Sequence, residues 1–148
     1  MRGRFGGSSG PLPEILVARA EGLFSELLAS AGEPTLLHSD LHHINILSAR
    51  REPWLAIDPK GVLGERAYEL GAFLYNLLPE FPRRRDLRKI LARRIDILCE
   101  RLELDRQRVV GYGLAQAVLS ACWDVEDGVP GWERTIRVAE VLGGMGEG

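Results

Sequence analysis

Residues 36–58 read Leu-Leu-His-Ser-Asp-Leu-His-His-Ile-Asn-Ile-Leu-Ser-Ala-Arg-Arg-Glu-Pro-Trp-Leu-Ala-Ile-Asp. Two short apolar runs in this stretch, 36–37 and 54–57, have the length and composition of buried strands. Four polar residues follow these runs: His38, Asp40, Asn45 and Asp58. Strands that deliver carboxylates and an amide to one edge commonly build an active site, so we expect these four side chains to lie close together.

The spacing of the first three residues indicates a chemistry. His-x-Asp, with Asn five residues after the Asp, matches the H-x-D-x-x-x-x-N catalytic loop of protein-kinase-like phosphotransferases. In such a loop Asp40 is placed to take the proton of an acceptor hydroxyl, and His38 orients the loop by hydrogen bonds. Asn45 and Asp58 supply the oxygen ligands that a hard cation such as Mg²⁺ prefers.

Two other interpretations of this stretch stay open. A loop between strands is often polar only because it is exposed to solvent. The histidines and aspartates also suit a zinc or manganese hydrolase, a lesser alternative that leaves Asn45 unexplained. The ligands in that case would be His38, Asp40, His42, His43 and Asp58.

Three runs of the sequence carry a family resemblance: 38–47, His-Ser-Asp-Leu-His-His-Ile-Asn-Ile-Leu; 54–62, Trp-Leu-Ala-Ile-Asp-Pro-Lys-Gly-Val; and 64–71, Gly-Glu-Arg-Ala-Tyr-Glu-Leu-Gly. They resemble the aminoglycoside/hydroxyurea antibiotic resistance kinase family. The resemblance extends from about residue 12 to the C-terminus and is dense only over 36–71. It implies a two-lobed kinase-like fold that moves the γ-phosphate of ATP to an alcohol, as in aminoglycoside kinases acting on streptomycin.

The resemblance assigns roles to individual residues. Asp40 would be the catalytic base, and Asn45 and Asp58 would be the Mg²⁺ ligands. An acidic residue at position 69 braces the active-site loop in the family, although Glu69 also suits the first turn of a helix by its charge alone. Lys60 is a candidate for binding the phosphates of ATP, and its other interpretation is a solvated turn lysine.

Two positions depart from the family pattern, which usually has glycine where this chain has Ser39 and Ile44. Glycine is favoured where the backbone takes a positive φ or approaches a ligand closely. A β-branched isoleucine is a poor substitute at such a position. The sequence therefore predicts a changed loop geometry at these two residues.

The predicted fold class is mainly α with a few short strands, corresponding to the C-terminal helical lobe of the protein-kinase-like, aminoglycoside phosphotransferase fold. We expect a disordered tail over 1–11, a kinase-like lobe over 12–143 with catalytic and metal loops at 36–60 and a helical acceptor-binding part at 65–143, and a second tail over 144–148. Apolar periodicity predicts helices over 13–31, 67–78, 84–103, 106–123 and 132–142, with Asp105 capping the fourth and most buried one. Strands are expected near 35–37, 44–48 and 54–57.

The nucleotide-binding N-lobe of a kinase is not expected in this chain. The residues before His38 are mostly one helix, and the first lysine, Lys60, comes too late to be the phosphate-holding lysine of that lobe. We therefore expect a fragment that has little activity alone and whose missing N-lobe would be its partner. The alternative is a non-catalytic remnant or binding protein that keeps the loop without turnover.

The net charge of −2 gives no reason to expect nucleic acid or an anionic membrane as partner. The expected location is cytoplasmic, because the sequence contains no secretory signal or apolar span. The expected partner is a small-molecule hydroxyl acceptor that is cationic and aminoglycoside-like. Trp123, Glu126 and Asp127 are the candidate acceptor-binding residues, because carboxylates at a helix C-terminus oppose the helix dipole and such conflicts often mark sites. The alternative is that Asp127 and Gly128 form a turn and the acids are solvated.

Overall fold

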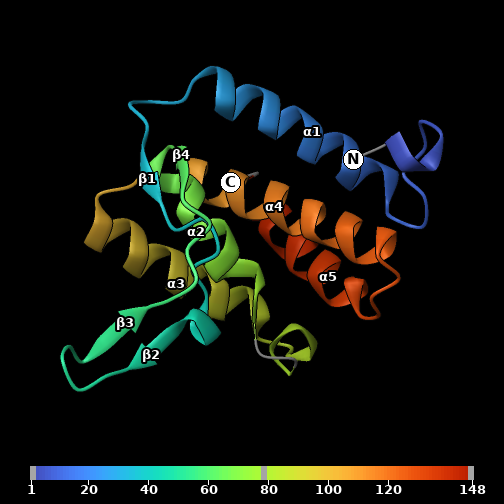
Figure 1. Ribbon diagram of the computed structural model, residues 1–148. Coiled ribbons are helices and arrows are strands. Elements are labelled where there is room, and N and C mark those ends of the chain that lie inside the picture. Colours follow the sequence, from blue (N-terminus) through green and yellow to red (C-terminus); the bar gives the residue numbers. More distant parts are fainter. Residues whose placement is uncertain (1–2, 78–79, 147–148) are drawn as a thin grey trace.

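The computed structural model describes residues 3–77 and 80–146, which form five α-helices and two antiparallel two-stranded sheets (Figure 1). The mainly helical class with a few short strands is confirmed. The α-helices are α1 (Glu14–Ala29), α2 (Arg66–Tyr75), α3 (Leu87–Leu102), α4 (Arg106–Glu126) and α5 (Trp132–Gly143). The strands are β1 (Thr35–Leu37), β2 (Ile46–Ser48), β3 (Trp54–Ala56) and β4 (Val62–Gly64), and short 3₁₀ helices lie at Gly3–Phe5, His43–Asn45 and Phe81–Arg83.

Helix α4 is the centre of the fold, and helices α1, α2 and α5 all pack against it (Figure 1). It is buried on nearly every side between Val109 and Cys122, as expected for a helix that is apolar all round. The prediction that this helix is the most buried one is therefore confirmed. Its largest fully buried side chain is Tyr112.

The two ends of α4 show what its sequence predicts and what it does not. Asp105 caps the start as predicted, because its carboxylate accepts a 2.8 Å hydrogen bond from the backbone N–H of Arg108. The C-terminal end was placed at 123, where the apolar pattern stops, but the helix continues to Glu126. Gly128, with φ of +69°, ends it instead, since a left-handed glycine closes a helix by bonding back to its last carbonyls.

An ion pair between Glu65 and Arg108 joins three helices. Arg108 donates to both carboxylate oxygens of Glu65, at 2.5 Å each, just before the start of α2. The same guanidinium donates to the Leu27 carbonyl and the Ser30 hydroxyl at the end of α1. Tyr112 adds a 3.1 Å hydrogen bond to Glu65. The ends of α1, α2 and α4 are thus held at one point.

Both sheets are short antiparallel strand pairs beside the helices (Figure 1). Strands β2 and β3 pair locally across the predicted turn, with Leu47 opposite Leu55. Residues 44 and 45, which the sequence predicts at the start of a strand over 44–48, belong instead to the 3₁₀ turn His43–Asn45. Strand β4 was not predicted at all, and it pairs with β1 so that Leu36 faces Leu63. The end of β1 therefore lies beside the segment after β3, where His38 contacts the backbone of Ile57 and Lys60.

The remaining predicted bounds differ by a few residues. Helix α3 begins at Leu87 rather than at 84 and ends at 102, because Arg84 forms a local ion pair with Asp86 ahead of the helix. Helix α2 ends at Tyr75, and the predicted end at 78 lies outside the described residues. Within 3–11 the chain forms a 3₁₀ turn and bends, so the disorder of this tail stays a prediction. Over the described ranges, no helix is both long and apolar enough to cross a membrane.

Candidate active site

His38 connects the loop after β1 to the end of β3. Its Nε2 lies 2.7 Å from the Ile57 carbonyl, and the backbone N–H of Asp40 donates to its Nδ1 at 3.3 Å. A carbonyl needs a donor and an N–H needs an acceptor, so these contacts assign Nε2 as the donor and Nδ1 as the acceptor of the ring. The backbone N–H of Lys60 also donates to the His38 carbonyl at 2.9 Å. His38 therefore orients the loop and does not line the cavity described below.

Ser39 has a left-handed backbone, with φ of +67°. Its N–H donates to both carboxylate oxygens of Glu69, at 3.1 and 3.2 Å, in the first turn of α2. The loop is thus braced by an acidic side chain, at the position that the family resemblance implied. Ile44, by contrast, lies in the 3₁₀ turn with an exposed side chain and without a positive φ. Only one of the two departures from glycine thus falls at a left-handed residue.

Asn45 is one of two buried polar side chains in the described part of the chain, with 9% of its surface exposed. Its amide nitrogen donates to the backbone carbonyl of Asp40 at 2.9 Å. This bond fixes which end of the amide is nitrogen, because a carbonyl accepts only from the NH₂ group. The amide oxygen is then the atom that Asn45 can offer to a cation.

Three charged side chains meet beside this loop. The ammonium of Lys60 lies 3.6 Å from a carboxylate oxygen of Asp40 and 3.4 Å from one of Asp58. Asp58 is 70% exposed and has a positive φ of 56°. An exposed carboxylate and an amide oxygen fit Mg²⁺, which usually takes few protein ligands and keeps several waters. Among residues 3–77 and 80–146, no group of three His, Cys, Asp or Glu side chains could hold a metal, so the zinc-hydrolase alternative has no ligand cluster there.

His42, within the loop of residues 38–45, lies close to Asp40 and Asn45, although the spacing gave it no role. Its Nε2 lies 3.6 Å from Asp40 Oδ1 and 3.4 Å from the amide nitrogen of Asn45. Its Nδ1 is buried and has no hydrogen-bond partner. Nε2 can accept a hydrogen bond from the Asn45 amide, whose nitrogen is a donor.

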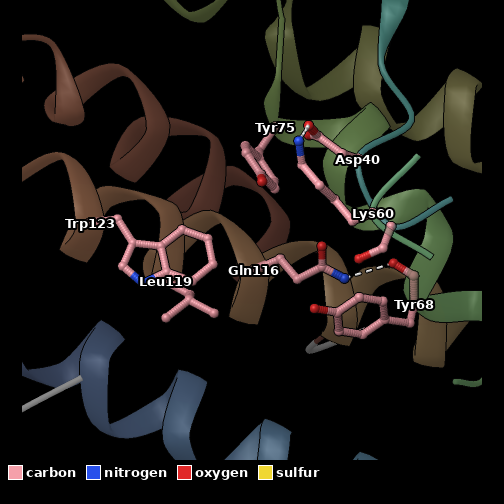
Figure 2. Close-up of a pocket in the computed structure, with 8 residues that line it drawn as sticks. Asp40, Lys60, Tyr68, Tyr75, Gln116, Leu119 and Trp123 are labelled. Carbon is pink, nitrogen blue, oxygen red and sulfur yellow. Dashed lines mark hydrogen bonds and ion pairs between the residues drawn. The ribbon is translucent and has the colours of Figure 1, made fainter. Parts of the chain in front are cut away.

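A cavity of about 240 Å³ opens in front of Asp40 (Figure 2). The catalytic loop, the segment after β3 and helices α2 and α4 form its walls. The lining residues are Ser39, Asp40, Lys60, Tyr68, Tyr75, Gln116, Leu119 and Trp123. Of the residues singled out in the sequence, Asp40, Lys60 and Trp123 line the cavity. The others, His38, Asn45, Asp58, Glu126 and Asp127, do not.

Four lining residues were not predicted from the sequence: Tyr68, Tyr75, Gln116 and Leu119. Tyr68 and Tyr75 are seven residues apart and so lie on one face of α2. Gln116 is a single polar residue in an apolar stretch of α4, and that contrast was the available signal. Glu126 and Asp127 lie beyond Trp123 where α4 ends, past the end of the cavity, and their contact with an acceptor stays a prediction.

The electrostatics around the cavity follow from burial. Burial raises the pKa of Tyr75, a hydrogen bond with Ser120 opposes this, and the nearby charge of Asp40 raises the pKa further. Burial also raises the pKa of Tyr68. Both phenols therefore stay protonated near neutral pH. Asp124 lines a neighbouring cavity that shares Tyr75, and burial raises the pKa of its carboxyl while Arg134 lowers it.

Comparisons with known proteins bear on the family of the chain. The family model of the aminoglycoside/hydroxyurea antibiotic resistance kinases matches residues 9–128. The chain is 41% identical to a streptomycin 6-kinase of Streptomyces griseus over 128 residues, which are 84% of this chain and 42% of that protein. It is 41% identical to a hydroxyurea phosphotransferase of Kitasatospora aureofaciens over 119 residues, 80% of this chain and 32% of that protein.

A streptomycin 3''-kinase of Klebsiella pneumoniae is 35% identical over 114 residues, 76% of this chain and 43% of that protein. The chain thus spans less than half the length of these relatives. No solved structure matches it significantly. The family match covers most of the chain, and the relatives agree with it. The chain belongs to the aminoglycoside/hydroxyurea antibiotic resistance kinase family.

Proposed function

We propose that this chain is the helical C-terminal lobe of a kinase that transfers the γ-phosphate of ATP to a hydroxyl group of an aminoglycoside-like acceptor. The observation that carries the proposal is the position of Asp40. Its carboxylate lines a cavity large enough for part of a small molecule, on a loop held by three separate side chains. Those side chains are His38, Asn45 and Glu69. Phosphoryl transfer depends mostly on such positioning and on charge stabilisation.

Each residue of the site has a task in this proposal. Asp40 accepts the proton of the acceptor hydroxyl as that oxygen attacks. Lys60 binds phosphate oxygens with the ammonium group that now lies between two carboxylates. Asn45 and Asp58 would hold Mg²⁺, which when bound neutralises negative charge on the phosphates. Trp123 forms an apolar wall for the acceptor, and Glu126 and Asp127 would attract a cationic one from beyond the cavity.

A complete nucleotide cleft needs a second lobe, and the exposed face of the sheets is where we place it. Leu36 and Leu63 are cross-strand neighbours in β1 and β4, and they are 73% and 71% exposed. Ile44 and Trp54 are similarly exposed in and beside the other sheet. Large apolar side chains exposed side by side, as Leu36 and Leu63 are, are typical of an interaction site. We therefore expect little turnover from the 148 residues alone, and a cytoplasmic setting where ATP is supplied.

The test is a chimaera in which this chain replaces the matching region of the Streptomyces griseus streptomycin 6-kinase. With ATP, Mg²⁺ and streptomycin, the chimaera is expected to phosphorylate the drug. Asp40→Asn should lower the rate by about 10²–10⁴-fold, the usual contribution of a general base, and leave nucleotide binding almost intact. Asp58→Asn should also weaken Mg²⁺-dependent nucleotide binding.

Two results would count against the proposal. If Asp40→Asn kept most of the rate, the base would be another residue. If the chimaera folded and bound Mg-ATP but transferred no phosphate to any acceptor, the alternative of a non-catalytic binding remnant would replace the enzyme.

A further inference from the structure

Gln116 is a buried polar side chain in the middle of α4, the most buried helix. Only 6% of its surface is exposed. Its amide nitrogen donates a 2.7 Å hydrogen bond to the backbone carbonyl of Tyr68 on α2 (Figure 2). Since that carbonyl accepts only from the NH₂ group, the bond fixes the orientation of the amide.

The side chain has little freedom to adopt another position. A Cβ atom at Gly71 of α2 would overlap the Gln116 amide, so this glycine makes the space that the amide fills. The amide oxygen is turned away from the Tyr68 carbonyl (Figure 2), and Gln116 lines the cavity in front of Asp40. Within the described residues no hydrogen bond to this oxygen is formed. An amide oxygen that borders a cavity and has no protein donor can accept a hydrogen bond from a ligand or from water.

The opposite side of the cavity is apolar. Leu119 and Trp123 follow Gln116 at three and seven residues along α4, so all three side chains share one helix face. Figure 2 shows Trp123 on the far side of Gln116 from Lys60. A molecule in the cavity therefore meets the Asp40 carboxylate, the Gln116 oxygen and an apolar wall at the same time.

We propose that Gln116 is a specificity-determining residue. Its amide oxygen accepts a hydrogen bond from a second O–H or N–H group of the acceptor molecule, so acceptors that carry such a group are selected. The favoured ligand carries an O–H or N–H group next to the reacting hydroxyl and has an apolar face that packs on Trp123. Polyhydroxylated and amino-substituted rings have this chemistry. The cavity volume of about 240 Å³ is below the usual 300–1,000 Å³ of ligand pockets, which suits one ring. The assignment of Asp40 to the reacting hydroxyl rests on the proposed function.

The experiment is an NMR titration of the ¹⁵N-labelled 148-residue chain with two matched compounds. The first, myo-inositol, has neighbouring hydroxyls, and the second, cyclohexanol, has a ring and a single hydroxyl. We expect myo-inositol to bind more tightly and to shift the side-chain amide signals of Gln116. In Gln116→Met, which keeps the length but removes the acceptor, myo-inositol should bind about two- to tenfold more weakly, the worth of one net hydrogen bond. Cyclohexanol binding should change little.

Gln107→Met is the matched control, because Gln107 lies on the same helix with an exposed side chain outside this cavity. It should bind myo-inositol as the unmodified chain does. The inference is overturned if the Gln116 amide signals of the unmodified chain do not move, if both compounds bind equally, or if neither binds. Equal myo-inositol affinity in folded Gln116→Met would also overturn it. Failure of the chimaera to transfer phosphate would reject the proposed function but leave these binding results standing.

Discussion

Ser39 has a backbone conformation that favours glycine over a residue with a side chain. It occupies the left-handed region with φ of +67° while its N–H bonds to Glu69. An L-residue in that region costs roughly 1–2 kcal/mol. The hydrogen bonds to Glu69 offset part of this cost, and they use only the backbone. Any residue with an N–H can therefore make them.

Ser39→Gly is expected to stabilise the protein by about 0.5–1 kcal/mol, because the relief of backbone strain exceeds the extra freedom that glycine gives to the unfolded chain. Urea unfolding of both proteins measures the difference. Ser48→Gly in strand β2 is the control and should destabilise slightly, because glycine weakens a strand. Equal destabilisation by both changes would mean that the loop does not hold a left-handed residue in solution.

The residues of the catalytic loop were the most predictable part of the site. Spacing predicted His38, Asp40, Asn45 and Asp58, since the chemistry requires those types at those intervals, and their catalytic and metal-binding roles stay predictions. The side chains that complete the cavity were not found, because their sequence signal is identical to that of a core face. Gln116 lies seven residues before Trp123, yet only the tertiary position of α2 shows that both border a cavity.

At the level of elements, helices were predictable and the sheet pairing was not. Periodicity and a capping Asp105 define α4, and both are local features. Strand β4 has only three residues, and its partner β1 lies far back in the sequence, with Thr35 opposite Gly64. The pairing of β1 with β4 depends on the tertiary arrangement of the chain, so no local sequence pattern predicts it. The late end of α4 has a local signal in Gly128, although the apolar pattern already stops at 123.

The ion pair that joins α1, α2 and α4 depends on Arg108, so removing this side chain should lower the free energy of unfolding. Arg108→Met is expected to destabilise the protein by about 2–4 kcal/mol, because it leaves the partly buried Glu65 carboxylate without its main partner. Thermal or urea unfolding measures the change. Arg106→Met is the matched control on the same helix. Its ion pair with Asp96 is exposed, so a change of about 0–1 kcal/mol is expected. Similar losses in both variants would contradict the special role of Arg108.

The same link predicts a dependence of stability on acid. The hydrogen bond from Arg108 is the main cause that lowers the pKa of Glu65 from its ordinary value of 4.5. The folded pKa is below the unfolded one, so the stabilisation is complete above about pH 4.5 and is lost as pH falls through the folded pKa. Unfolding free energies measured between pH 7 and pH 3 should fall more steeply for the native sequence than for Glu65→Gln. Parallel curves would show that Glu65 titrates normally.

At the scale of the whole molecule, the exposed leucines of the first sheet should matter for association and not for folding. Leu36→Thr combined with Leu63→Thr is expected to change the unfolding free energy by about 0.5 kcal/mol or less, because both side chains already contact solvent. Light scattering should show less self-association, and the chimaera carrying both changes should lose stability between its lobes. Leu28→Thr, at an equally solvent-facing site on α1, is the control and should leave association unchanged. A large loss of folding stability in the double variant would mean that this face is packed within the chain.

The contact between Gly71 and Gln116 has a consequence for how the sequence can change over time. Every residue except glycine places a Cβ where the Gln116 amide lies, so a substitution at 71 is blocked while the glutamine is present. If 116 first becomes smaller, position 71 can accept a side chain, and the return of glutamine is then blocked in turn. The order in which positions 71 and 116 mutate therefore decides which residues each of them can hold afterwards. A protein that has gained a side chain at position 71 would have to bind its acceptor with a residue other than Gln116.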